Sequence, residues 1–435
     1  MTLDATALYL LATRALSGEF AAALELVSAL ANARPTELSR LATIVREPRR
    51  RPVPWPSIEM WSVLELDPTL PRDAVLLCAA SLDRDGFLRA VAVRALARSS
   101  ISSARRFLWM RLDDVVPRIA ESADEALLAN PLALDALVAE VPLLDLLAMR
   151  ARARRQPAFV RAMARLASGD GDVRAALSRG LSSPDSDVRA SCARRLAGSD
   201  DAVFIEALRV ALADPSPRVY LWAAREASLR KTAPAVAATV APVMCAHDDP
   251  SVRLRGVRIV ARGEDNPEAL LSATIDVDAS VRFEARAAVV RGGAFDYRAV
   301  AVEALSEEAS DARRVLGALG AMYDVGERDD WTLVSRYLSH PMSRVQAEAL
   351  RALTSLAPDL FVDAFAGALR HKSRRVAREA VSALERCAVS LSDAVFRTAV
   401  SDATLREISD DASLRESVRI TARRLLKARR VKLAP

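Results

Sequence analysis

The stretch that decides the fold is DDPSVRLRGVRIVAR, residues 248–262. Its pattern is an acidic or turn residue, then Val-Arg, then a helical run with several arginines, and it recurs in DSDVRASCARRLAG (185–198), DASVRFEARAAVV (278–290) and ESVRITARRLL (416–426). Within each run, apolar or small residues recur at the first position and at the positions four and seven later, which places them on one stripe of an α-helix. The sequence therefore predicts a repeated helical element.

The apolar residue that begins each run marks a period. These landmark residues are Leu88, Val116, Val160, Val188, Val219, Val252, Val281, Val315, Val345, Val376 and Val418, and successive landmarks lie 28 to 44 residues apart, most of them near 30. Before each landmark comes a turn rich in Asp, Pro, Ser or Gly, and before the turn another helical run such as residues 201–212. Each repeat is therefore predicted to be a helix hairpin, and a period near 30 with insertions is typical of a solenoid.

The acidic residue before Val-Arg suits the N-cap of the second helix, because a short carboxylate accepts hydrogen bonds from the first free amides. The arginine that follows lies at the edge of the buried stripe, within reach of the acidic turn of the adjacent repeat. This arrangement predicts a ladder of ion pairs made by Arg189, Arg253, Arg282 and Arg419. At Arg218, Arg344 and Arg375 the arginine comes before the valine, and the pattern does not decide whether a ladder contact forms there.

These residues resemble HEAT repeats, a family of armadillo-type α-solenoids whose second helix often opens with Asp, a few residues, then Val-Arg. The resemblance covers at least residues 80–430 and is strongest from 172 to 385. It implies an all-α solenoid of roughly 12–13 helix hairpins. It also implies a scaffold or adaptor, since most proteins of this family are of that kind.

The period suggests five segments. We expect an N-terminal helical cap at 1–47, an extended Pro/Arg-rich loop at 48–73, irregular repeats at 74–171, regular repeats at 172–385, and a last repeat with a basic capping helix at 386–435. The loop is expected to be extended because proline removes a backbone donor and blocks helix formation. The irregular stretch 130–158, with three prolines, is interpreted as a poorly matching repeat.

Composition limits the classes of function. Only four of the 62 basic residues are lysines, an excess of arginine that indicates a GC-rich bacterial genome. The net charge of +6 is small beside 56 acidic residues, so there is no polycationic domain. The sequence contains no signal peptide, no apolar run long enough for a membrane span and no paired cysteine motif, which favours a cytoplasmic protein with reduced thiols.

Catalytic and cofactor motifs are also lacking. The three histidines, His247, His340 and His371, are not followed by glutamate, as the iron ligands of the HEAT-like deoxyhypusine hydroxylases are. They are expected at the ends of first helices in an ordinary structural role. With no phosphate-binding glycine loop and no nucleophile beside a base, we expect no enzyme, no cofactor, no metal and no small-molecule substrate.

One alternative is an enzyme that acts on DNA. HEAT-like alkylpurine DNA glycosylases use a Trp and an Asp one helical turn apart on a basic face, and Trp109 and Asp113 have that spacing. The alternative for Trp109 is partial burial on the apolar stripe of its helix.

Arginine recurs six residues after the landmark, about 120° from the stripe, at Arg94, Arg194, Arg225, Arg258 and Arg351. In HEAT stacks the second helices line the concave surface, so the pattern predicts an arginine row there. Guanidinium groups bind carboxylates and phosphates through paired hydrogen bonds. The alternative is that these arginines pair with acids of the chain itself, such as Glu226, Glu284, Glu348 and Glu379.

A second candidate surface is the loop with Arg49, Arg50, Arg51 and Trp55, as a docking element or as a cover for the N-terminal helices. The favoured function is a non-enzymatic adaptor that binds an acidic protein partner on the concave arginine row. Two alternatives remain: a nucleic-acid-binding protein, including a glycosylase, and a regulatory subunit of an enzyme complex.

Overall fold

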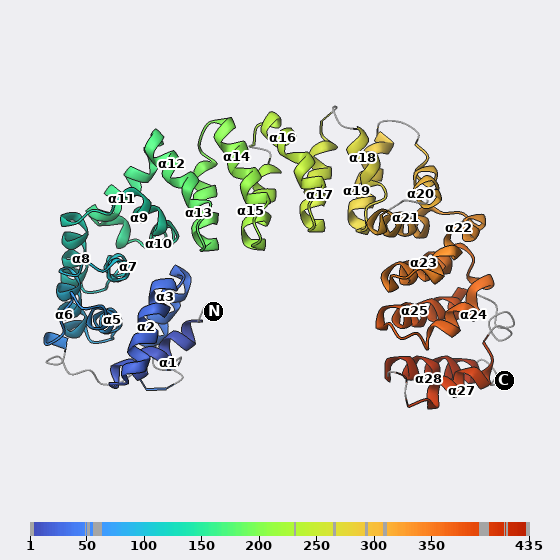
Figure 1. Cartoon of the computed structure of the whole chain (residues 1–435), viewed down its shortest axis with the longest axis horizontal. Helices are drawn as coiled ribbons and strands as arrows, with labels where there is room; N and C mark the ends of the chain where they lie inside the picture. Colours follow the sequence, from blue (N-terminus) through green and yellow to red (C-terminus); the bar gives the residue numbers. More distant parts are fainter. Residues whose placement is uncertain are drawn as a thin grey trace. The chain divides into compact units, whose positions relative to one another are not determined.

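The computed structural model describes residues 4–47, 49, 53–54, 63–229, 232–263, 267–291, 295–307, 311–390, 400–412, 414 and 416–431 (Figure 1). Over these residues the regular structure is helical, with no β-strand. The chain forms two compact units, Met1–Ala223 and Ala224–Pro435. The division falls in a helix, α15 (Pro217–Ala227), inside the stretch of regular repeats.

The first unit begins with three helices and continues with hairpins. Its helices are α1 (Ala5–Leu16), α2 (Phe20–Asn32), α3 (Pro35–Arg46), α5 (Pro71–Ala80), α6 (Gly86–Leu96), α7 (Ser102–Arg111), α8 (Pro117–Ala129), α9 (Leu134–Ala139), α10 (Val141–Leu147), the short η2 (Ala153–Arg155), α11 (Pro157–Ala167), α12 (Gly171–Gly180), α13 (Ser186–Leu196) and α14 (Asp201–Leu212). The irregular stretch 130–158 contributes α9, α10 and η2, which are shorter than the other helices listed for the first unit.

The described residues of the second unit form helix hairpins. Its helices are α16 (Pro234–Cys245), α17 (Pro250–Val260), α18 (Pro267–Ala273), α19 (Ala279–Arg291), α20 (Tyr297–Ser306), α21 (Ala312–Val325), η3 (Arg328–Asp330), α22 (Trp331–Ser335), η4 (Arg336–Ser339), α23 (Ser343–Leu356), α24 (Pro358–Ala368), α25 (Arg374–Ser390), α27 (Asp402–Asp410) and α28 (Glu416–Val431).

In both units the two helices of a hairpin pack on each other, and second helices pack on second helices of the next repeat. In the first unit α5 pairs with α6, and α6 packs on α8. In the second unit the series α21, α23, α25 and α28 runs in this way from one repeat to the next (Figure 1). The chain is thus an all-α solenoid of HEAT-like hairpins, in which each apolar stripe is buried by the neighbouring repeat.

Most landmark residues lie in the core, as predicted. Val188, Val252, Val281 and Val345 are at most 3% exposed. The prediction is wrong at two landmarks, Val116 and Val160, which are 36% and 52% exposed. In both irregular repeats the landmark lies at a different distance from the helix start than in the regular repeats: Val116 is the N-cap of α8, and Val160 is the fourth residue of α11. The buried stripe therefore lies elsewhere on each helix. It is formed by Ile119, Ala120 and Ala123 in α8 and by Ala158, Phe159 and Ala162 in α11.

The predicted acidic N-caps are present in three of the four runs, whereas Glu416 is the first residue of α28. The carboxylate of Asp249 accepts from the backbone N–H of Ser251 at 2.7 Å, and Asp185 and Asp278 make the equivalent bonds. Each carboxylate satisfies an amide that has no partner within the helix and lies at the positive end of its dipole. The first residues of the repeat therefore fix where the second helix starts.

The predicted ladder is the main polar contact between repeats. Arg253 donates from Nε and Nη2 to both carboxylate oxygens of Asp276 in the next repeat, at 2.7 and 2.8 Å. Its Nη1 donates to the carbonyl oxygens of His247 and Asp248 in its own turn, at 2.9 and 2.7 Å. One guanidinium thus joins two turns. Arg89 with Asp114 and Arg189 with Asp214 make the same set of bonds.

The ion pairs differ from the predicted ladder at Arg282, in the last repeat, and where the arginine comes before the valine. Arg282 pairs with Asp324, at the far end of the next second helix. Arg419, in the last repeat, pairs with Glu416 of its own helix, so the prediction of a ladder contact there is wrong. Arg218, a reversed position, pairs backwards with the buried Asp187 of the preceding repeat.

Two glycines of α21 let it approach the neighbouring repeat closely. A Cβ on Gly317 would lie 1.7 Å from the carbonyl oxygen of Ile275, and a Cβ on Gly320 would lie 2.6 Å from Nη1 of Arg282. The first contact is with backbone, which cannot rotate away. The stacking of α21 therefore depends on the absence of a side chain at residue 317.

We expect Arg253→Gln to lower the free energy of unfolding by about 3–5 kcal/mol, because it leaves the carboxylate of Asp276 buried without its cation. Arg258→Gln, on the same helix, is the control. Its pair with Glu284 has an arginine side chain that is 48% exposed, so a loss of at most about 1 kcal/mol is expected. Urea denaturation of both variants measures the difference, and equal losses would contradict the role of the ladder.

Gly317→Ala is expected to cost about 1–3 kcal/mol through overpacking. Gly367→Ala in α24 is the matched control, since a Cβ there meets no atom within 4 Å. That change is expected to be neutral or to stabilise by up to about 1 kcal/mol, because alanine favours the helix. The urea midpoints of the two variants should move in different directions.

Candidate functional site

The arginines predicted to form a row lie on the second helices of five hairpins and are called the second-helix arginines. They are Arg94 on α6, Arg194 on α13, Arg225 on α15, Arg258 on α17 and Arg351 on α23. The first four are exposed, as the spacing predicts. Arg194 donates to the hydroxyl of Ser191 at 2.7 Å and lies 3.8 Å from Asp145. Arg94 and Arg225 have no carboxylate within ion-pair distance among the described residues.

The other two second-helix arginines pair with acids that the sequence suggested. Arg258 donates to Glu284 at 2.9 Å. Arg351 is half-buried, donates to Glu348 at 3.3 Å and stacks over the ring of Tyr323 at 4.4 Å, so the expectation of an exposed side chain is wrong there. The tyrosine, one repeat earlier, holds its guanidinium against the surface.

The candidate docking loop falls mostly outside the described residues, which include neither Arg50, Arg51 nor Trp55. Arg49 is exposed. The carbonyl oxygen of Val53 accepts from the hydroxyl of Tyr9 in α1 at 2.6 Å, which places this point of the loop on the N-terminal helices.

Trp109 and Asp113 are not brought together as a glycosylase pair. Trp109 is 4% exposed and lines a small cavity of about 70 Å³ with Leu127 and Ala158. Asp113 lies in the turn after α7 and faces a different cavity with Arg46 and Arg150. The helix ends at Arg111, so the spacing of one helical turn does not hold to residue 113.

The arginines near Trp109 are also engaged within the protein. Arg106 pairs with Glu140 at 2.7 Å, and Arg105 donates to the carbonyl oxygen of Asn130 at 2.8 Å. Arg111 is 2% exposed. Arg161 and Arg165 of α11 are exposed and line the same cavity as Trp109, and Arg165 donates to the carbonyl oxygen of Leu132 at 2.8 Å.

The three histidines share one place in the repeat. Nδ1 of His247, His340 and His371 accepts from the backbone N–H two residues later, at 2.9, 3.1 and 3.0 Å. Each ring thus closes the turn between the two helices of a hairpin, the structural role that the sequence predicts. Within the described part of the chain, no group of three His, Cys, Asp or Glu residues is arranged to hold a metal ion.

The four cysteines do not form a reactive centre. Burial raises the pKa of Cys192 to about 12 and the pKa of Cys245 and of Cys387 to about 11, and it raises the pKa of Cys78 further. A thiol with so high a pKa is protonated at neutral pH, and the thiolate is the nucleophile.

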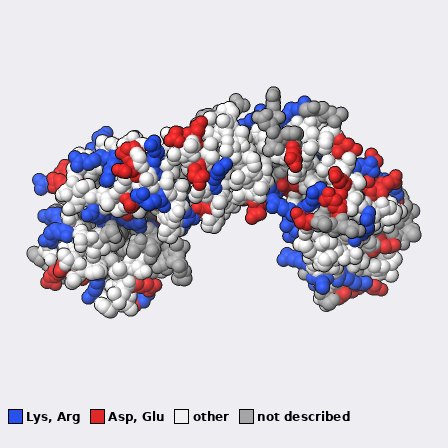
Figure 2. Space-filling view, turned by 45° about the horizontal axis from the view of Figure 1, so that its top comes forward, with Lys and Arg blue, Asp and Glu red and all other residues white. Residues whose placement is uncertain are grey.

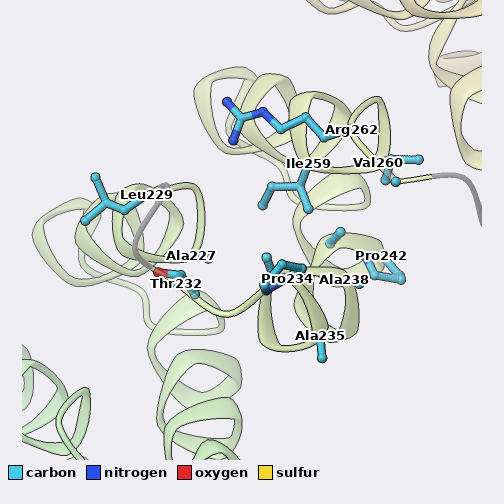
Figure 3. Close-up of a pocket in the computed structure, with 13 residues that line it drawn as sticks. Ala227, Leu229, Thr232, Pro234, Ala235, Ala238, Pro242, Ile259, Val260 and Arg262 are labelled. Carbon is cyan, nitrogen blue, oxygen red and sulfur yellow. The ribbon is translucent and has the colours of Figure 1, made fainter.

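The second unit carries an apolar groove of about 680 Å³ (Figure 3). One wall is the side of α16, with Pro234, Ala238 and Pro242, and the opposite walls come from the end of α15 and the end of α17. Leu229 and Ile259 face this space from two sides, and Arg262 extends along its rim (Figure 3).

Two arginines meet beside this groove at Ser228. Nη1 of Arg255 lies 3.2 Å from the hydroxyl of Ser228, and Nη1 of Arg262 lies 3.5 Å from its carbonyl oxygen. Neither arginine has an ion pair with a described carboxylate. Arg255 lies within α17, whereas Arg262 follows the C-cap of that helix, Ala261, so neither belongs to the arginine row that the helical spacing predicted.

Charges of both signs are spread over each unit on the face shown in Figure 2. None of the helices in the described ranges has the length and the unbroken apolar character needed to cross a membrane. The groove with its two arginines, together with the second-helix arginines, is therefore the most distinctive surface feature of the described residues.

No family model and no curated protein matches the chain. Among solved structures, Kap121p is 11% identical with a TM-score of 0.40, and the match covers 96% of this chain and 53% of that one. Importin beta is 13% identical with a TM-score of 0.35, covering 97% and 55%. An engineered protein is 21% identical with a TM-score of 0.27, covering 81% and 97%. The chain spans about half the length of Kap121p and importin beta, and at these values the similarity carries no inference about function.

We expect the thiols to resist modification in the folded protein, because the raised pKa values keep them protonated and burial blocks access. A chromogenic disulfide reagent at pH 8 should react slowly with the native protein and at once with all four thiols in urea. Rapid labelling of any thiol in the native state would contradict the burial described above.

Proposed function

We propose that the protein is a non-enzymatic scaffold or adaptor that binds an acidic segment of a protein partner through arginines of its second helices. The observation that carries the proposal is the charge around the groove of the second unit. Arg262 on its rim and Arg255, which meets Arg262 at Ser228, have no ion pair with a described carboxylate, whereas the ladder arginines are saturated by aspartates.

The contrast between these two classes of arginine supports a binding role. A guanidinium at a repeat junction uses its donors on one carboxylate and two carbonyl oxygens, so it has little capacity for a ligand. Arg255 and Arg262 instead bond only to oxygen atoms of Ser228. Their remaining donors suit the paired hydrogen bonds that a carboxylate accepts.

The groove adds an apolar anchor point. Leu229, Pro242 and Ile259 provide apolar surface next to the cationic rim. A segment in which an apolar side chain lies beside glutamates or aspartates fits both features. Such anchors account for most of the affinity in peptide recognition, and the surrounding charge steers association.

The charge distribution favours a protein partner over nucleic acid. Binding to a phosphate backbone needs a continuous basic stripe, and here acidic residues are spread among the basic ones (Figure 2). Arg94 and Arg194 in the first unit offer a separate set of weak contacts. Repeats that each contribute a little can together give useful affinity.

The test uses a labelled peptide of alternating glutamate and leucine, a matched lysine and leucine peptide, and a single-stranded DNA of random sequence. We expect the acidic peptide to bind, and the double variant Arg255→Glu/Arg262→Glu to weaken it by about tenfold or more, since each lost ion pair becomes a repulsion. Arg118→Glu, at an exposed arginine of α8, is the control and should leave binding unchanged.

Two results would contradict this proposal. Tighter binding of the DNA than of the acidic peptide, with affinity that falls steeply with salt, would indicate a nucleic-acid-binding protein. Equal binding of the acidic and basic peptides would show that the arginines do not select the partner.

A further inference from the structure

A second cavity, of about 420 Å³, lies in the first unit and has a different character. It is enclosed by α3, the end of α7, α10 and the turn after α10. Its walls combine apolar and cationic side chains, among them Ala42, Arg46, Arg111, Leu143, Leu147 and Arg150. The cavity therefore joins the N-terminal helices to the repeats that follow.

Three guanidinium groups converge beside this cavity on one carboxylate, Asp114, whose side chain is fully buried. Arg89 binds both of its oxygens, at 2.8 and 2.9 Å. Nη1 of Arg111 donates to Oδ2 at 3.3 Å and to the carbonyl oxygen of Ser81 at 2.9 Å, and Arg46 lies 3.7 Å from Oδ2. The backbone N–H of Val116 donates to Oδ1 at 3.0 Å, so one carboxylate serves three guanidinium groups and an amide.

The local charge is consequently not balanced. Nε of Arg111 is buried and has no acceptor among the described residues. Burial lowers the pKa of Arg111 to about 9 and also lowers the pKa of Arg46, which is the direction expected for cations that lack enough anions. Both groups still carry a positive charge at neutral pH.

The other acids near the cavity do not remove this excess. Asp113 is 4.0 Å from Nε of the exposed Arg150 and is engaged there. Glu47 lines the cavity from its exposed position after α3. Four arginines thus face three carboxylates, and two of the three arginines in the cavity wall, Arg46 and Arg111, share with Arg89 the single carboxylate of Asp114.

We propose that this cavity binds a small organic anion, with a carboxylate or phosphate head at Arg46 and Arg111 and an apolar body against Met110, Leu143 and Leu147. Partly desolvated cations that share one counter-charge are incompletely neutralised, which costs free energy, and a bound anion lowers that cost. The cavity volume falls within the range of about 300–1,000 Å³ that is typical of small-molecule sites. This inference is independent of the proposed partner binding, which uses the second helices.

A bound anion would also contact two parts of the first unit at once. Arg46 comes from α3, near the N-terminus, and Arg111 comes from the end of α7. The apolar wall comes from α10, on which α3 packs. A ligand that touches all three helices stabilises the folded state in proportion to its occupancy.

The experiment measures binding of octanoate and octyl phosphate by calorimetry, together with the thermal midpoint of the full-length protein. Two control probes each lack one feature: octanol lacks the charge, and inorganic phosphate lacks the apolar chain. We expect the two amphipathic anions to bind and to raise the midpoint, octanol and inorganic phosphate to bind at least tenfold more weakly, and a difference between octanoate and octyl phosphate to identify the preferred head group.

Variants test the residues. Arg46→Gln should weaken both anions at least tenfold, and its side chain is 36% exposed, so the fold should tolerate the change. Arg40→Gln, at an exposed position of the same helix, is the matched control and should bind normally. Leu146→Trp, at a half-buried lining position, should fill the cavity and abolish binding of both anions.

The proposal is overturned if octanol binds as tightly as octanoate, if inorganic phosphate binds as tightly as octyl phosphate, or if Arg46→Gln and Leu146→Trp both leave binding intact. Failure of both anions to bind the unmodified protein would also overturn it. The proposal of peptide binding is tested with variants of Arg255 and Arg262, and the proposal of anion binding with variants of Arg46 and Leu146. Either proposal can therefore fail without the other.

Discussion

In the repeats that carry it, the polar contact that holds one hairpin turn to the next is made by a single arginine. Its five N–H donors lie in one plane, so a single side chain can bind a carboxylate with two of them and carbonyl oxygens of its own turn with a third. At Arg253 these bonds use Asp276, His247 and Asp248. A lysine ammonium lacks this planar fork. Arginine at this position therefore has a structural cause that the high arginine content of the whole chain does not explain.

The regular repeats could be predicted from the sequence because three local signals agree there. At residues 248–262 the N-cap aspartate, the Val-Arg pair and the apolar spacing all indicate the same helix start, and α17 begins at Pro250. The prediction failed in the irregular repeats because these three signals do not indicate the same helix start there. Val116 precedes the proline at which α8 begins, so it caps the helix and does not enter its core. The apolar residue was visible in the sequence, but its place relative to the helix start was not.

The candidate sites depend on tertiary contacts and were harder to predict. Helical spacing correctly placed Arg94, Arg194, Arg225 and Arg258 on an exposed side. It could not show that Tyr323 on α21 would hold Arg351 to the surface, because that contact joins two repeats. The convergence of Arg46, Arg89 and Arg111 on Asp114 brings together residues from α3, α6 and α7. No spacing within one repeat reveals such a group.

The turn between the helices of a hairpin shows how charge is matched along the chain. In three repeats the position of the ladder arginine is held by Tyr220, Leu316 or Gln346, and the next turn in the sequence carries His247, His340 or His371. Each histidine accepts the amide hydrogen bond that Asp276 accepts from Asp278 in its own turn. A neutral imidazole supplies this acceptor without adding a negative charge. Where no guanidinium comes from the repeat before, a carboxylate would be left without its cation, and the cost of that unpaired charge explains why histidine replaces aspartate there.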